Sequence, residues 1–134
     1  MEALALKMMK AAQDYDFDTL RDCYTPDATL WLNITGATLR AADHLNTVKT
    51  VTTQVKNLRH DNIRVRAIPG GYVQQHRTRG ELPNGKTYEV HACFVVEVRD
   101  GKIAHRAEYI DSAAVAAVRE FGFLKPAGAP ETAS

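Results

Sequence analysis

A chain of 134 residues and 14.8 kDa, 45% hydrophobic and 25% charged, fits one soluble globular domain with a single core. The net charge of +1 gives no overall basic field for nucleic acid, and no apolar run reaches membrane-spanning length. Cys23 and Cys93 are too few for a secreted disulfide framework, and Met1–Lys10 lacks the apolar core of a signal peptide. A reduced, cytoplasmic protein is therefore expected.

The N-terminal part is predicted to contain three helices and one strand. Apolar residues at helical spacing predict a helix over Glu2–Gln13, and Asp16 or Asp18 can cap a second, short helix. Alternation then predicts a strand over Asp27–Asn33. The helical period returns over Ala41–Val55, which predicts the third helix.

Four consecutive strands are predicted next, at Asn62–Ile68, Tyr72–Leu82, Thr87–Arg99 and Lys102–Asp111. Asn-Gly and Asp-Gly between the last three strands are strong hairpin signals. A helix over Ser112–Glu120 and a disordered Pro/Ala/Gly-rich tail over 125–134 complete the prediction, so that residues 1–124 form one domain. Helices followed by an antiparallel meander indicate an α+β fold, with a ligand site at the mouth of the curved sheet.

Counting outward from the hairpin turns predicts which residues face each other. If both turns contain two residues, His76, Cys93 and Glu108 form a row across three strands on one face. A single β-bulge would shift this row by one residue and bring Gln75 or Arg77 into it instead. The row is therefore a hypothesis about the strand register.

Two local patterns resemble the SnoaL-like branch of the nuclear-transport-factor-2-like superfamily. They are Asp16-x-Asp18-x-Leu20 leading to Tyr24-x-Pro26-Asp27-Ala28, and Asp100-Gly101-Lys102-Ile103 leading to Glu108-Tyr109-Ile110-Asp111. The resemblance covers about residues 3–120. Members of the superfamily include polyketide cyclases, ketosteroid isomerase and limonene-epoxide hydrolase. It implies a cone-shaped α+β barrel with a deep, mostly apolar pocket, no cofactor, and commonly a homodimer through the outer face of the sheet.

Glu108 is the first candidate for chemistry, because the family often places an acid at this position. Burial in an apolar pocket would raise its pKa and suit proton transfer near neutral pH. The alternative is a carboxylate paired with Arg106 or Arg77 on a solvent-exposed face. His76 and His91 could share acid–base work with Glu108, or could be hydrogen-bonded strand residues.

The same residues admit two further interpretations. His76, His91 and Glu108 contain the elements of a two-His-one-carboxylate metal site, although their spacing does not require one and no metal is expected. Cys93 beside a histidine could be a nucleophile, but a buried cysteine more often acts as a small hydrophobic residue.

Trp31 and Asn33 match a Tyr-x-Asn pattern of limonene-epoxide hydrolase, which also needs an Arg-x-Asp pair on a later strand. This chain has Gln75-His76-Arg77 there, so the second carboxylate is missing and epoxide hydrolysis by that mechanism is not expected. The alternatives are core packing for Trp31 and a turn role at the strand end for Asn33.

Tyr15 and Tyr24 lie near the helix pair that roofs the pocket in this family. Ketosteroid isomerase combines a tyrosine with two acids, and only Glu108 is available here, so that set is incomplete. The strand from Val73 to Glu81 is polar on both faces, which fits an edge, a dimer interface or a polar pocket wall. The arginines at 64, 66, 77 and 79 indicate a solvated face.

These patterns predict a pocket for a small hydrophobic molecule. Glu108, His76 and His91 are the candidate catalytic residues, and the candidate ligand contacts are Trp31, Asn33, Tyr15, Gln75, Arg77 and Cys93. If the protein is an enzyme, the expected activity is a cofactor-free, isomerase- or cyclase-like acid–base reaction on a small lipophilic carbonyl compound. The alternatives are a non-catalytic binding protein and a dimeric scaffold of the same fold.

Overall fold

A computed structural model of the chain describes residues 1–113 and 116, and it confirms the α+β class. The elements in chain order are α1 (Glu2–Gln13), α2 (Phe17–Asp22), β1 (Tyr24–Leu32), β2 (Thr38–Arg40), α3 (Ala41–Thr52), β3 (Lys56–Ile68), β4 (Gly71–Glu81), β5 (Thr87–Arg99) and β6 (Lys102–Ile110). The predicted domain end at residue 124, the tail and most of the predicted helix over 112–120 lie outside the described residues.

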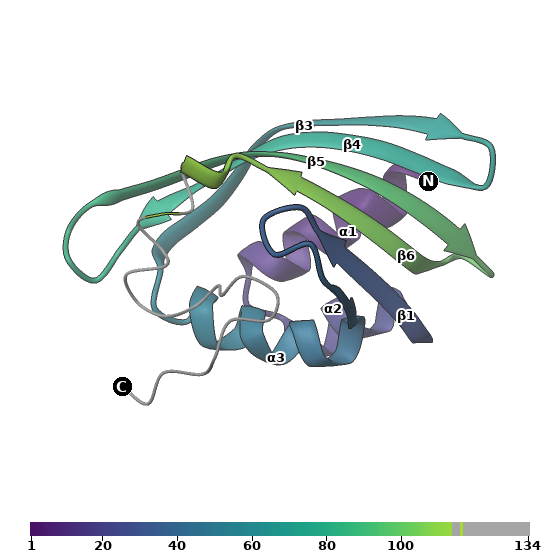
Figure 1. Ribbon diagram of the computed structural model, residues 1–134, viewed down its shortest axis with the longest axis horizontal. Coiled ribbons are helices and arrows are strands. Elements are labelled where there is room, and N and C mark those ends of the chain that lie inside the picture. The colour runs from purple at the N-terminus through teal and green to yellow at the C-terminus, as the bar shows by residue number, and fades with distance from the viewer. Residues whose placement is uncertain (114–115, 117–134) are drawn as a thin grey trace.

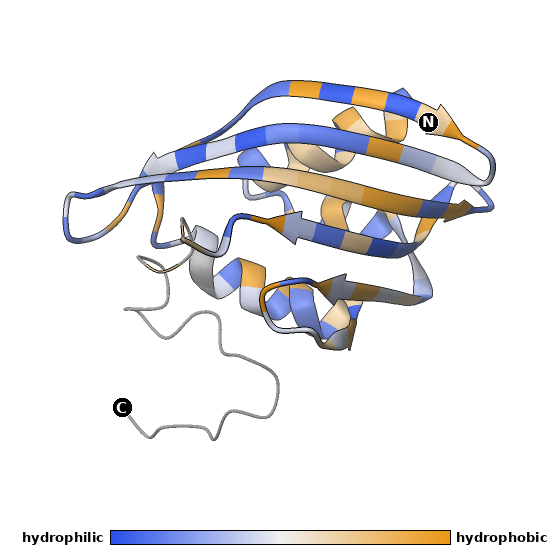
Figure 2. Ribbon diagram, turned by 45° about the horizontal axis from the view of Figure 1, so that its top comes forward, coloured by the Kyte–Doolittle hydropathy of each residue, from blue (hydrophilic) through white to orange (hydrophobic). Residues whose placement is uncertain are grey.

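The six strands form one curved sheet in the order β2-β1-β6-β5-β4-β3. β1 runs parallel to β6, and every other neighbouring pair is antiparallel. The three helices lie together on the concave side of this sheet (Figure 1). Hydrophobic and hydrophilic residues alternate clearly along β3, whereas β4 is hydrophilic along most of its length and the middle of β5 is hydrophobic (Figure 2). The face of the sheet toward the helices contains the buried apolar side chains of the strands, such as Tyr72 and Val96.

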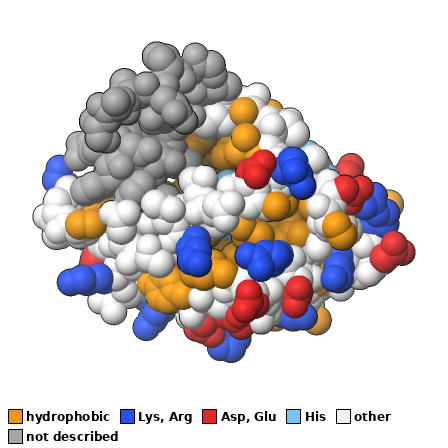
Figure 3. Space-filling view, turned by 90° about the horizontal axis from the view of Figure 1, so that it is seen from below, with side chains coloured by type: hydrophobic (Ala, Val, Ile, Leu, Met, Phe, Trp, Pro, Cys, Tyr) orange, Lys and Arg blue, Asp and Glu red, His pale blue; other side chains and the backbone are white. Residues whose placement is uncertain are grey.

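The core forms between the helices and the concave face. Met8 of α1, Tyr72 of β4 and Val96 of β5 are at most 1% exposed within it. On the helical side of the molecule, patches of hydrophobic side chains lie among charged ones (Figure 3). No helix among the described residues is long and apolar enough to cross a membrane.

Several predicted boundaries differ from those in the structure. β1 begins at Tyr24 and includes Pro26, which lies where the pairing with β6 is irregular, so its missing N–H breaks no regular ladder. β3 begins at Lys56, and its register shifts near Asn57 and Asn62, which both have φ of 56°. The alternation used for prediction covers only the part beyond the second shift. The short strand β2 was not predicted.

The predicted register of the last three strands is wrong by one residue in both hairpins. The β4–β5 loop contains three residues, Pro83-Asn84-Gly85, because Leu82 pairs with Lys86 and Gly85 takes φ of 82°. The two-residue turn at Asp100-Gly101 is confirmed by the Arg99–Lys102 pair. Beyond it, however, Ala104 forms a β-bulge, since Val98 pairs with Ile103 and Glu97 with His105.

Because of these two irregularities, His76, Cys93 and Glu108 do not form the predicted row across the three strands. Gln74 pairs with Phe94, and Phe94 with Glu108. Cys93 instead pairs with Gln75 and Tyr109. Even-numbered residues of β4, β5 and β6 therefore face the helices over this region, and odd-numbered residues face away.

Candidate functional site

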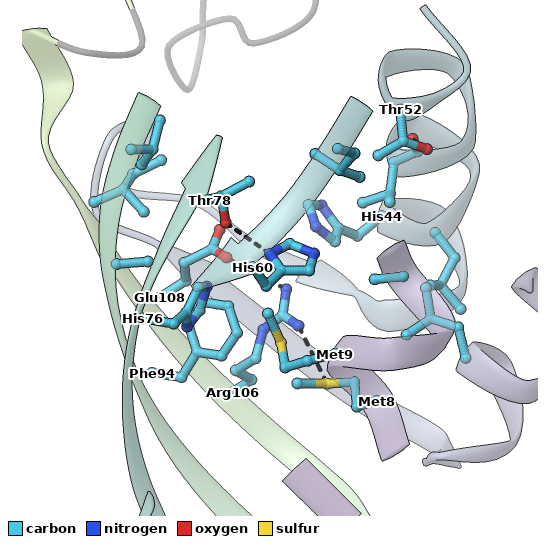
Figure 4. Close-up of a pocket in the computed structure, with 18 of the residues that line it drawn as sticks. Met8, Met9, His44, Thr52, His60, His76, Thr78, Phe94, Arg106 and Glu108 are labelled. Carbon is cyan, nitrogen blue, oxygen red and sulfur yellow. Dashed lines mark hydrogen bonds and ion pairs between the residues drawn. The ribbon is translucent and has the colours of Figure 1, made fainter. Parts of the chain in front are cut away.

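A cavity of about 180 Å³ lies between the three helices and the concave face of β3–β6. Its wall is mostly apolar, with Met8, Met9, Leu45 and Val48 on the helices and Phe94 on the sheet. Polar side chains enter this wall in two groups, one around Arg106 and one around His60 (Figure 4). An apolar enclosure with a few convergent polar groups is the usual form of a small-molecule site.

Arg106 is the centre of the first polar group. Its Nη1 donates to the Tyr24 hydroxyl at 2.6 Å, and that hydroxyl donates to Met8 Sδ at 3.4 Å. Arg106 Nη2 lies 3.6 Å from Glu108 Oε1, and the guanidinium carbon lies 4.4 Å from the Phe94 ring centroid. Only 8% of the Arg106 side chain and 15% of the Glu108 side chain is exposed. A cation is thus held in an apolar cavity by one carboxylate, one hydroxyl and an aromatic face.

Burial raises the pKa of the Glu108 carboxyl, and the neighbouring positive charge of Arg106 offsets part of that rise. Burial also raises the pKa of the Tyr24 hydroxyl, against the opposing effect of Arg106. Tyr24 therefore stays protonated at neutral pH. A carboxyl group with a raised pKa is a stronger base than a solvated one once it is ionised, which suits it to accept a proton and later return it.

The second polar group contains His60 of β3 with His76 and Thr78 of β4. His60 Nδ1 lies 2.9 Å from Thr78 Oγ1, and the rings of His60 and His76 are 5.7 Å apart in an edge arrangement. His76 Nδ1 lies 3.0 Å from the Gln74 side-chain nitrogen, and the ring centroids of His76 and Phe94 are 4.7 Å apart. Phe94 therefore stands between the two polar groups, with Arg106 over its face and His76 against it.

Burial lowers the pKa of three histidines in the cavity wall. It falls to about 3 for His76, where His60 and Arg106 add to the effect, and to about 4 for His60 despite the opposing charge of Asp61. For His44 of α3 it falls to about 3, with a further contribution from Arg106. All three imidazoles are neutral near pH 7, so each has one N–H donor and one nitrogen acceptor.

The structure places Glu108 and His76, two of the three predicted catalytic residues, in the cavity wall. The third, His91, is on the opposite face of the sheet, because odd-numbered residues of β5 point away from the helices. Its Nε2 lies 3.4 Å from Glu89 Oε1. His91 is therefore not brought together with His76 and Glu108, and the two-His-one-carboxylate arrangement does not form.

Three predicted ligand contacts share the outer face with His91, and their placement in the cavity was wrong for the same reason of register. Gln75, Arg77 and Cys93 border a groove on that face. Arg77 lies 3.0 Å from Asp61 and 3.7 Å from Glu89, so it belongs to a surface ion-pair network.

The remaining predicted contacts do not line the cavity either. Trp31 packs against Tyr109 on the outer face, with ring centroids 5.2 Å apart. Asn33 donates to the carbonyl of Ile110 and accepts from its N–H, both at 3.0 Å, which is the strand-end role considered as an alternative. Tyr15 adopts φ of 58°, and its hydroxyl donates to the Val55 carbonyl at 2.9 Å.

Sequence reasoning missed Arg106, His44 and His60 as cavity residues. For Arg106 a signal was available in the neighbouring strand, since Val90, Ala92, Phe94 and Val96 are apolar at every second position of β5. That alternation identifies the buried face and, through strand pairing, the inward side of β6. No comparable local signal marks His44 or His60.

The sequence profile of a family described as "SnoaL-like domain" matches residues 5–106. Among solved structures, a Bacillus subtilis protein provisionally described as an isomerase is 17% identical, over 91% of this chain and 92% of its own, with a TM-score of 0.74. A Shewanella denitrificans protein provisionally described as a SnoaL-like polyketide cyclase is 14% identical, over 90% and 96%, with a TM-score of 0.72.

An M. tuberculosis epoxide hydrolase resembling limonene-epoxide hydrolase is 19% identical, over 84% of this chain and 83% of its own, with a TM-score of 0.69. No curated protein matches the chain in sequence. At these identities, the structural likeness establishes a shared fold.

Proposed function

The chain belongs to the SnoaL-like domain family, and from that premise we propose that it binds a small lipophilic carbonyl compound in the cavity and catalyses cofactor-independent proton transfer on it. The observation that carries the proposal is the Glu108 carboxyl group, which lies in a mostly apolar wall 3.6 Å from Arg106. Its raised pKa favours reversible proton exchange with a carbon acid.

In the proposed reaction, the Glu108 carboxylate removes a proton from the carbon next to the substrate carbonyl. The C–H electron pair forms the enolate double bond, and the negative charge moves from Glu108 to the substrate oxygen. Arg106 stays beside both positions and can balance the charge before and after transfer. Where a C=C bond adjoins the enolate, Glu108 returns the proton to the far carbon of that bond, as in an isomerase. Alternatively, the enolate carbon attacks a second carbonyl of the same molecule, as in a cyclase, and the alkoxide that forms takes the proton from Glu108.

Epoxide hydrolysis that requires two carboxylates gains no support from the cavity wall. Among the described residues that line it, Glu108 is the only carboxylate. Arg106 already engages this carboxylate, and the histidines in the wall are neutral. The presence of a single carboxylate among the described residues of the cavity wall also favours a second candidate function, namely ligand binding without turnover.

The test is exchange of the α-protons of cyclohexanone with deuterated water, followed by proton NMR. We expect the wild-type protein to accelerate the exchange and Glu108→Gln to lower the protein-catalysed rate by about 100-fold or more, within the range of general base catalysis. The amide keeps the shape of the side chain, so cyclohexanone binding should persist.

The matched control is Glu89→Gln, which makes the same replacement on the outer face of β5. This variant should exchange α-protons at the wild-type rate. If the wild type binds cyclohexanone but exchanges its protons no faster than Glu108→Gln does, the catalytic proposal is wrong and the binding function remains.

A further inference from the structure

A second polar subsite lies in the same cavity, around the ring of His60. We propose that this subsite binds a hydroxyl group of the ligand, on the side of the ligand ring remote from Glu108. The substrate class is then a monocyclic ketone that carries a hydroxyl group. The inference rests on the proposed function only in placing a carbonyl compound in this cavity with its reactive end toward Glu108.

The position of His60 separates it from the reactive end. His60 lies on β3, which is three strands away from β6 in the sheet order. Phe94, on the intervening strand β5, contacts Arg106 on one side and His76 on the other. Figure 4 shows both polar groups entering one cavity from the sheet. A ligand lying over Phe94 can therefore meet Glu108 at one end and His60 at the other.

The hydrogen bonding of His60 is incomplete. Its Nδ1 is engaged by Thr78 Oγ1 at 2.9 Å, whereas its Nε2 is a buried atom with no partner among the described residues. A buried polar nitrogen without a partner costs free energy, which a ligand group can recover. The described residues do not provide that group, and because Nε2 has almost no accessible surface, a ligand hydroxyl reaches it only by displacing the side chains that cover it.

The chemistry of His60 Nε2 indicates which group it accepts. The Thr78 hydroxyl can donate to Nδ1 or accept from it, so Nε2 is an acceptor in one tautomer and a donor in the other. The low pKa of His60 keeps the ring neutral in both cases. A hydroxyl group pairs with either tautomer because it both donates and accepts, whereas a carbonyl pairs with only one of them.

The cavity is partly open to the surface, and its interior has room for about one ring. Its volume of about 180 Å³ is close to that of engineered apolar cavities of about 150 Å³ that hold benzene. A fused multi-ring compound would extend beyond this space. The cavity therefore matches a single ring with one oxygen directed to each polar group.

The test compares two ligands of nearly equal shape, 4-hydroxycyclohexanone and 4-methylcyclohexanone, by isothermal titration calorimetry. An apolar wall alone would bind the methyl compound more tightly, because methyl burial is favourable and hydroxyl burial is not. With the proposed subsite, the wild type binds the hydroxyl compound about tenfold more tightly. His60→Phe removes both ring nitrogens and should reverse this preference.

His44→Phe is the matched replacement elsewhere in the cavity wall. This replacement can change the affinity for each compound, but the ratio of the two affinities should equal that of the wild type. In wild-type protein, histidine ring ¹⁵N spectra provide a measurement that does not depend on the folding of a variant. The hydroxyl compound should shift the His60 Nε2 resonance, and the methyl compound should leave it unchanged.

Equal binding of the two compounds by the wild type, or tighter binding of the methyl compound, would overturn the subsite. The proposed function would still stand if exchange of the methyl compound depends on Glu108. A hydroxyl preference without proton exchange would instead uphold the subsite and overturn catalysis. Binding of neither compound would overturn both.

Discussion

The two faces of strands β4–β6 contain similar residue types in opposite environments. On the inner face, His76 and Glu108 are enclosed in the cavity wall, and burial is the largest cause of their shifted pKa values. On the outer face, Glu89 and His91 are adjacent to each other, and Arg77 joins them. A change of one position along a strand thus moves a side chain from a desolvated site to a solvated ion-pair network. The face, more than the residue type, determines the chemistry.

Replacing one aromatic residue on each face should give the largest contrast in stability. Phe94 is 5% exposed and contacts Arg106 and His76, so Phe94→Ala should lower the free energy of unfolding by about 3–5 kcal/mol. Tyr109 is 46% exposed, and Trp31 is its ring contact among the described residues. Tyr109→Ala should therefore lower the free energy of unfolding by only about 1 kcal/mol. Urea unfolding measures both, and equal losses would contradict the assignment of faces.

Two arginines provide the second contrast. Arg106→Met removes the charge that Glu108 and Tyr24 face in the cavity, and it should lower the free energy of unfolding by about 3 kcal/mol. Arg77→Met breaks partly exposed ion pairs with Asp61 and Glu89 and should cost at most about 1 kcal/mol.

The same pair of variants can be made in a Glu108→Gln background. There the cost of Arg106→Met should be smaller, because no buried carboxylate is left without its partner. The cost of Arg77→Met should not change. An Arg106→Met loss that is independent of residue 108 would show that the 3.6 Å pair contributes nothing to stability.

The pH dependence of unfolding is a third way to separate the faces. The pKa of His76 falls from 6.5 to about 3 on folding, so the unfolded state binds a proton that the folded state does not. The resulting stability is complete above pH 6.5 and is lost as the pH falls toward 3, at about 1.4 kcal/mol per pH unit. Glu108 acts with the opposite sign, since its raised pKa favours the folded state at low pH.

Replacing His76 with glutamine should therefore reduce the slope of stability against pH by about one proton between pH 4 and 6. Urea unfolding at several pH values gives this slope for both proteins. A slope that stays at the wild-type value would mean that His76 is not desolvated in the folded protein.

The smallest effect concerns the two thiols and requires no change in stability. Cys93 is partly exposed on the outer face, whereas Cys23 is 1% exposed and burial raises its pKa. Since the thiolate is the reactive form, Ellman's reagent should label one thiol in the folded protein and two in urea. Cys93→Ser should abolish the labelling of the folded protein. Rapid labelling of both thiols would place Cys23 in contact with solvent.

The sequence predicted the elements better than their relation to one another. Predicted and observed limits coincide for α1 and β5, because an uninterrupted helical period and strong turn signals define them. The predicted register depended on counting from two turns that were both assumed to contain two residues. The β4–β5 loop contains three residues and β6 contains a bulge at Ala104, so each count was wrong by one residue. The apolar alternation along β5 would have assigned its faces correctly.

The hydrogen bond that accommodates Arg106 in the cavity could not have been predicted from local patterns. Arg106 is a charged residue on an inward-facing strand position, which contradicts the expected apolar alternation. Its partner Tyr24 is 82 residues away in the chain. Only the tertiary structure brings the two together, and only that contact explains how the buried charge is accommodated.

The bulge at Ala104 has a consequence for how this protein can evolve. If Ala104 instead paired regularly with Glu97, the rest of β6 would slip by one residue against β5, so that Tyr109 would take the inward side and Glu108 would leave the cavity. The residue count between Gly101 and Glu108 and the bulge must therefore change together, since one residue fewer keeps Glu108 on the inner face only if the bulge is also lost. In alignments with relatives, an acid at the matching column can serve the same purpose only where the count from the turn and the presence of the bulge together keep it on the inner face.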